Sequence, residues 1–152
     1  MPKFNGQALQ DKFVLNILKN KENGTFLDMG AHEPIYINNT YILEKEFGWK
    51  GILFEYMEHF RPSYEEHRSN SVHVISDATT LDYTRLMDET EMPENIDYLS
   101  LDLDGDATIK ALRKLDEKVM DRHKFAVVTY EHDVYAGGNH IAAREESRNI
   151  FK

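Results

Sequence analysis

Five short apolar runs divide this chain, and segments with helical spacing separate them. The runs cover residues 25–29, 51–54, 72–75, 96–101 and 125–130. Between the last two runs, Ile109, Leu112 and Leu115 recur at the spacing of one helix face. Strands that alternate with helices predict an α/β domain whose doubly wound, mainly parallel sheet carries helices on both faces.

The chain is expected to form one domain over residues 1–152. No repeat, low-complexity stretch or linker rich in Pro, Gly and Ser interrupts it. An N-terminal helix at about residues 7–20 is predicted by the helical spacing of Leu9, Phe13, Val14, Ile17 and Leu18. Asn39 or Thr40 is expected to cap a helix that ends near Gly48.

Composition limits the function classes that fit this chain. The absence of cysteine excludes disulfide frameworks, thiolate zinc sites and cysteine nucleophiles. Because 18 Lys and Arg stand against 27 Asp and Glu, the net charge is -9 and nucleic acid is a poor candidate partner. No apolar run approaches the roughly 18 residues of a membrane span, and the first residues lack the layout of a signal peptide. We therefore expect a cytoplasmic protein with no membrane partner.

Acidic residues follow every one of the five apolar runs. In open parallel sheets, ligands bind beyond the carboxyl ends of the strands. Scattered surface charge would not collect at these positions, so we expect the functional site there. The acidic residues are Asp28 and Glu33, Glu55, Asp77, Asp102 to Asp106, and Glu131 to Asp133.

Asp28, Gly30 and Glu55 favour a nucleoside as the ligand. A carboxylate at a strand end can accept hydrogen bonds from ribose hydroxyls, and a glycine lets the backbone approach the ligand. The glycine-rich pattern that binds a pyrophosphate is absent after Gly30, and so is a P-loop. S-adenosylmethionine is a nucleoside cofactor without a pyrophosphate, and it fits this pattern. The alternative for Asp28 alone is a turn with an acidic cap.

Three residues are candidates for the chemical step. Asp102 and Asp104 follow the fourth run, and one of them is expected to face the reacting centre. A calcium loop is excluded there, because Ala107 and Arg113 stand where such a loop needs glycine and glutamate. His132 lies between two acidic residues and is a candidate general base. A polar loop, or a divalent metal held by His132, its acidic neighbours or Asp104, remains an alternative for that segment.

Three stretches of the sequence resemble the FkbM-type methyltransferases. They are residues 24–32 (GTFLDMGAH), 39–55 (NTYILEKEFGWKGILFE) and 96–105 (IDYLSLDLDG), and the stretch from residue 39 is the most specific. The segments EHD at 131–133 and REESR at 144–148 are also similar to the end of that family's pattern. The resemblance implies a class I, Rossmann-like methyltransferase that uses S-adenosylmethionine and acts on a hydroxyl oxygen.

The same resemblance implies a role for each candidate residue. Asp102 and Asp104 would lie near the transferring methyl group, where alignment and a base are what the protein supplies. The residues implied for the cofactor are Asp28, Gly30 and His32 at its methionine end, Glu55 at its ribose, and Asp77 with Ala78 at its adenine.

Two features depart from the family's pattern. Glu33 and Pro34 replace an Asp-Gly pair, and proline is stiffer and lacks an N–H donor. The chain also stops one helix after the fifth strand, whereas the class I fold adds two more strands. Residues 125–130 would then form an exposed edge, which either a longer protein or a second copy of the chain in a homodimer would cover. Of the two, we favour a fragment of a longer protein.

The expected function is therefore O-methylation of a hydroxyl on a small molecule or glycan, with His132 or Asp104 as base and no resident metal. The alternative is a non-catalytic module of the same fold that binds a nucleoside or a partner chain. A third hypothesis is metal-dependent hydrolysis by the acidic residues, which a chelator would abolish.

Overall fold

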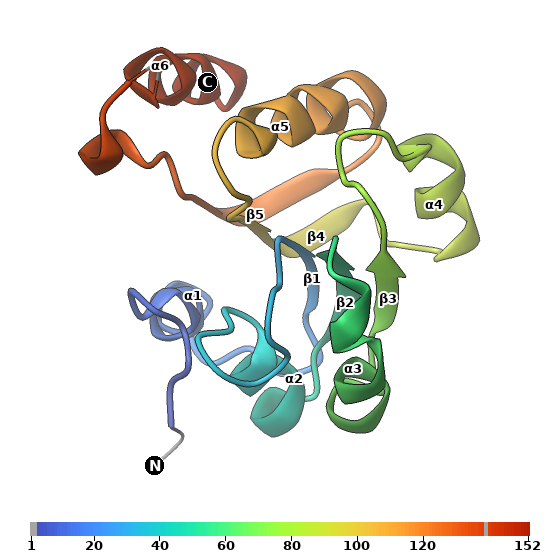
Figure 1. Cartoon of the computed structure of the whole chain (residues 1–152). Coiled ribbons are helices and arrows are strands. Elements are labelled where there is room, and N and C mark those ends of the chain that lie inside the picture. The colour runs from blue at the N-terminus through green and yellow to red at the C-terminus, as the bar shows by residue number, and fades with distance from the viewer. Residues whose placement is uncertain (1–2, 139) are drawn as a thin grey trace.

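The structure, a computed structural model, describes residues 3–138 and 140–152. Helices cover both faces of a central sheet, with the first three on one face and the last three on the other (Figure 1). The strands are β1 (Thr25–Met29), β2 (Lys50–Glu55), β3 (Val72–Ile75), β4 (Asn95–Leu101) and β5 (Lys124–Tyr130). The helices are α1 (Gln10–Ile17), α2 (Tyr41–Phe47), α3 (Arg61–His67), α4 (Tyr83–Glu89), α5 (Ala107–Lys118) and α6 (His140–Ile150), with short 3-10 helices η1 (Glu58–Phe60) and η2 (Val134–Ala136).

All strand pairs are parallel, and their order is β3-β2-β1-β4-β5. The chain moves outward from β1 to the β3 edge and then crosses to β4 on the other side of β1. This reversal places a topological switch point between β1 and β4, where open α/β sheets bind ligands. The predicted doubly wound α/β fold is confirmed, and each predicted strand is found within one residue of its expected ends.

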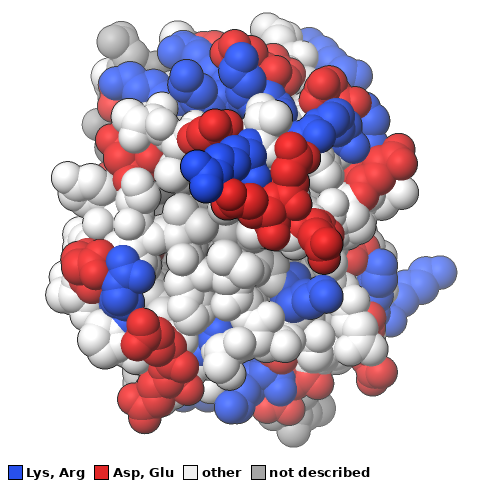
Figure 2. Space-filling view, turned by 90° about the vertical axis from the view of Figure 1, so that its right-hand side faces the viewer, with Lys and Arg blue, Asp and Glu red and all other residues white. Residues whose placement is uncertain are grey.

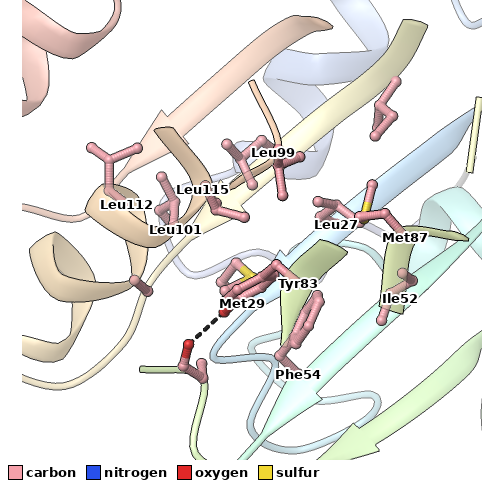
Figure 3. Close-up of a cluster of buried hydrophobic side chains, with 14 of the residues drawn as sticks. Leu27, Met29, Ile52, Phe54, Tyr83, Met87, Leu99, Leu101, Leu112 and Leu115 are labelled. Carbon is pink, nitrogen blue, oxygen red and sulfur yellow. Dashed lines mark hydrogen bonds between the residues drawn. The ribbon is translucent and has the colours of Figure 1, made fainter. Parts of the chain in front are cut away.

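Side chains point alternately to the two faces of each strand, and they form two hydrophobic cores, one on each face of the sheet. Leu27 and Met29 of β1 face α4 and α5, where they pack with Leu112 and Leu115 (Figure 3). Phe26, one residue earlier, belongs to the opposite core with Trp49 and Tyr64. Because both faces are covered, β1 is buried along its whole length, and its one charged residue, Asp28, is buried with it.

The N-terminal helix is shorter than expected and buries only part of its predicted apolar face. It spans Gln10–Ile17, within the predicted 7–20, but Leu9, Phe13 and Ile17 are exposed. Asp11 is buried instead, and its carboxylate accepts the backbone N–H groups of Asn5 and Gly6 at 2.6 and 3.0 Å. These hydrogen bonds connect the helix to the segment before it. Val14 lies in the core, so only part of the predicted apolar face is turned outward.

The two edges of the sheet are β3 and β5. Figure 2 views the side of the molecule where β3 and α4 lie, and an uncharged area at the centre of this face is surrounded by regions of mixed charge. Among residues 3–138 and 140–152, no helix is long and apolar enough to cross a membrane.

Candidate functional site

A cavity of about 500 Å³ lies at the carboxyl ends of β1, β2 and β4 and beside the segment that follows β3. This is the switch point of the sheet, the position where doubly wound folds bind ligands. Eight of the nine residues predicted for the site line the cavity. They are Asp28, Gly30, His32, Glu55, Asp77, Ala78, Asp102 and Asp104.

His132 is the ninth predicted residue, and the structure does not place it on the cavity wall. Its half-buried ring lies in the segment between β5 and η2, where Nδ1 accepts the backbone N–H of Val134 at 3.2 Å. The next residue, Asp133, has a left-handed φ of 51° and turns the chain into η2. The proposed base and the cavity are therefore not brought together.

Gly30 brings the ends of β1 and β4 together. Its φ is +84°, and a Cβ at this position would collide with the backbone carbonyl oxygen of Asp102. Only glycine fits such a left-handed position with a neighbouring backbone so close. The sequence interpretation assigned this close approach to a ligand, whereas the nearest group is the chain's own backbone.

Glu55 is buried at the end of β2, and its carboxylate already accepts three backbone hydrogen bonds. One oxygen accepts the N–H of His32 at 2.6 Å, and the other accepts those of Tyr56 and Met57 at 2.8 and 3.0 Å. A carboxylate offers about four acceptor positions, so one remains for a ligand hydroxyl. The bonds also hold the loops after β1 and β2 against each other at the cavity.

Asp28 belongs to a buried polar network, which we define as Asp28, Asn38, Thr40, Glu44 and Arg68. Thr40 donates its hydroxyl to Asp28 at 2.7 Å and accepts a hydrogen bond from Arg68 at 2.9 Å. The Arg68 guanidinium also forms a 2.8 Å ion pair with Glu44 and donates to Asn38 at 3.0 Å. All five residues are buried, so the network fixes the segment that carries the cavity wall.

Burial raises the pKa of Asp28, while the Thr40 hydroxyl and the charge of Arg68 act in the opposite direction. Sequence reasoning missed Arg68 and Asn38. Glu44 and Thr40 do lie in the stretch that carries the family resemblance, but Arg68 is 24 residues away from Glu44 and no local pattern marks it. The Thr40 side chain does not cap α2, because its hydroxyl is used by Asp28.

Asp102 has the most unusual environment of the predicted catalytic residues. It belongs to an acidic cluster, which we define as Asp102, Asp104, Glu131 and Asp133. Burial, together with the negative charges of Glu131, Asp28 and the other members, raises the pKa of Asp102 to about 6. In the part of the chain that the structure describes, no group donates a hydrogen bond to this half-buried carboxylate. Asp104 is exposed at the rim.

Asp77 and Ala78, which were predicted for the adenine end of the cofactor, also line the cavity. Asp77 accepts hydrogen bonds from the backbone and hydroxyl of Thr79 at 2.8 and 2.7 Å, which lower its pKa. Ala78 is buried beside it. The lining also includes Tyr56 and Met57, which are exposed and apolar and which sequence reasoning missed. In the sequence, only their position directly after Glu55 indicated that they would line the cavity.

The described residues do not form a metal centre. Among residues 3–138 and 140–152, no group of three or more His, Asp or Glu side chains is placed to hold a metal ion. Of the acidic cluster, Asp102 and Asp104 line the cavity, and Glu131 and Asp133 add negative charge near Asp102.

Family models, curated proteins and solved structures were compared with the chain, and none of them matches it.

Proposed function

We propose that the chain is an S-adenosylmethionine-dependent methyltransferase of the FkbM type, which methylates a hydroxyl on a small molecule or glycan. The observation that carries the proposal is the cavity at the switch point, which gathers eight predicted residues from four separate segments. Six of these residues are those that the sequence predicts for this cofactor, and Asp102 and Asp104 are two of the three that it predicts for the chemical step. We further propose a cytoplasmic location, with a homodimer as one way in which the β5 edge would be covered.

The lining offers complementary groups for each part of the cofactor. Glu55 retains an acceptor position for a ribose hydroxyl. Tyr56 and Met57 present exposed apolar surface beside it, which suits the face of an adenine ring. Asp77 and Ala78 line the same side of the cavity and would contact the adenine edge.

Methyl transfer needs alignment and a proton acceptor. The hydroxyl oxygen of the acceptor forms a bond to the methyl carbon, and the carbon–sulfur bond breaks with its electron pair left on sulfur. The hydroxyl proton then moves to a carboxylate. Asp102 suits this role better than His132, because it lines the cavity and its pKa of about 6 lies close to neutral pH.

Titration calorimetry with S-adenosylhomocysteine, the product form of the cofactor, tests the proposal. We expect binding by the native protein and at least a tenfold loss of affinity in Glu55→Gln, because an amide cannot accept hydrogen bonds at both positions. Glu65→Gln is the matched control, since Glu65 is exposed on α3. Circular dichroism must show that all three proteins are folded. A folded native protein that binds no S-adenosylhomocysteine would refute the proposal.

A second candidate is a non-catalytic nucleoside-binding module of the same fold. The position of His132 outside the cavity wall favours it, because the histidine expected to act as base is not at the site. This candidate predicts binding of S-adenosylhomocysteine without methyl transfer to any member of a panel of sugars and small alcohols. Transfer of a labelled methyl group to any acceptor would exclude it.

A further inference from the structure

The charges that line the cavity are all of one sign. Five carboxylates contribute to its wall, and no Lys or Arg does so among the residues that the structure describes. The outer surface differs, because basic and acidic side chains lie beside one another on the face in Figure 2. The lining carboxylates are those of Asp28, Glu55, Asp77, Asp102 and Asp104.

The carboxylates of this wall differ in whether they accept hydrogen bonds from the protein. Asp28, Glu55 and Asp77 each accept hydrogen bonds from the protein. Asp102 accepts none from the described residues, although it is half-buried. A partly buried carboxylate without a partner is costly unless a ligand supplies a positive charge or a donor.

Nearby cations of the protein are engaged elsewhere. Lys110 of α5 forms an ion pair with Asp106 at 2.8 Å. Arg113, one turn later, pairs with Glu146 of α6 at 2.6 Å. The two carboxylates beyond β5, Glu131 and Asp133, add negative charge near Asp102 rather than compensating it. Neither Lys110 nor Arg113 contributes to the cavity wall, so among the described residues no cation lies beside Asp102, and its charge is open to solvent and to a ligand.

We propose that this cavity selects its cofactor by charge, with Asp102 as the residue that distinguishes S-adenosylmethionine from S-adenosylhomocysteine. The inference rests on the proposed function. The two molecules differ by one methyl group and by the positive charge of the sulfonium. The acidic wall stabilises the sulfonium, and methyl transfer removes that charge. The product, S-adenosylhomocysteine, has a neutral sulfur, so the carboxylates of the wall no longer attract it by charge.

The proton balance of the reaction agrees with this cycle. Each transfer converts one sulfonium to a neutral thioether and places one hydroxyl proton on a carboxylate. At neutral pH that proton leaves Asp102 for solvent, because its pKa of about 6 lies below the pH of the medium. The site returns to its negative state, which again favours the charged cofactor over the neutral product.

The experiment measures the dissociation constants of both molecules by titration calorimetry at pH 8 and low salt, without an acceptor. We expect S-adenosylmethionine to bind about tenfold more tightly than S-adenosylhomocysteine to the native protein. In Asp102→Asn, which keeps the shape of the side chain, the ratio should fall to about one. Asp121→Asn removes the same charge at an exposed position between α5 and β5, and it should leave the ratio unchanged.

A salt titration of the native protein provides a second measurement that needs no variant. The ratio should decrease as salt screens the carboxylates, because shape complementarity alone would not respond to ionic strength. Equal binding of the two molecules, or tighter binding of S-adenosylhomocysteine, would overturn the inference while leaving the proposed function intact. A tenfold ratio that persists in Asp102→Asn would overturn the role of Asp102. Binding of neither molecule would overturn both proposals.

Discussion

Two groups of charged side chains reach this cavity, one through Asp28 and the other through Asp102 and Asp104, and they differ in how their charges are compensated. In the buried polar network, Arg68 neutralises Glu44, and Thr40 connects it to Asp28. In the acidic cluster beyond β4 and β5, Asp102 has no protein donor among the described residues, and its neighbours repel it. A compensated network stabilises the fold, whereas an uncompensated group indicates a place where a ligand completes the structure.

The comparison predicts that the network contributes far more to stability than the cluster. Arg68→Met should lower the free energy of unfolding by about 3–5 kcal/mol, because it leaves Glu44 buried without its partner. Urea denaturation followed by circular dichroism would measure the change. Arg85→Met is the control, since its ion pair with Glu89 is exposed on α4 and contributes only about 0.3–0.5 kcal/mol. Equal losses in the two variants would show that the network does not hold the cavity wall.

In the cluster, removal of the charge should stabilise the protein. The folded-state pKa of Asp102, about 6, lies above the ordinary value of 3.8, so the folded protein binds this proton more tightly than the unfolded chain. Its contribution to stability is therefore present below about pH 4 and is lost as the pH rises toward 6. The substitution Asp102→Asn removes the carboxylate, and with it the loss of stability that occurs as the pH rises. At pH 8 the variant should be more stable than the native protein by about 1–2 kcal/mol, after allowance for partial exposure.

Urea denaturation at pH 4 and pH 8 measures this difference. At pH 4 the two proteins should have nearly the same stability, because Asp102 is largely protonated in the folded native protein. Asp121→Asn controls for net charge, and its effect should stay within about 0.5 kcal/mol at both values. An Asp102→Asn variant that is less stable than the native protein at pH 8 would mean that the carboxylate has a stabilising partner after all.

The same contrast explains what the sequence could and could not reveal. The β1 and β4 strands and their acidic ends were predictable, because apolar runs and the position of Asp28 or Asp102 after them are local patterns. The ion pair between Arg68 and Glu44 was not predictable, because its residues are 24 positions apart in the chain and no local pattern marks Arg68. Likewise, α1 was found from its periodicity, but the pattern did not show which periodic residues are buried: Val14 lies in the core, whereas Phe13 and Ile17 are exposed.

His132 shows the limit of local reasoning at the site itself. A histidine between two carboxylates is a plausible base in any sequence, yet its direction depends on the backbone around it. The left-handed φ of 51° at Asp133 and the hydrogen bond from Val134 hold the ring in its own loop. No pattern in the segment 131–133 specifies this turn, because non-glycine residues adopt such angles only in particular contexts.

The smallest effect is therefore expected at His132. In His132→Ala the affinity for S-adenosylhomocysteine should change by less than about twofold, since the ring does not line the cavity. Turnover with a cognate acceptor should also stay within about threefold of the native rate, because a carboxylate at Asp102 accepts the proton. Calorimetry and transfer of a labelled methyl group measure the two quantities. If turnover falls by the hundredfold or more that loss of a general base causes, while affinity is unchanged, the loop after β5 must close over the cavity during catalysis.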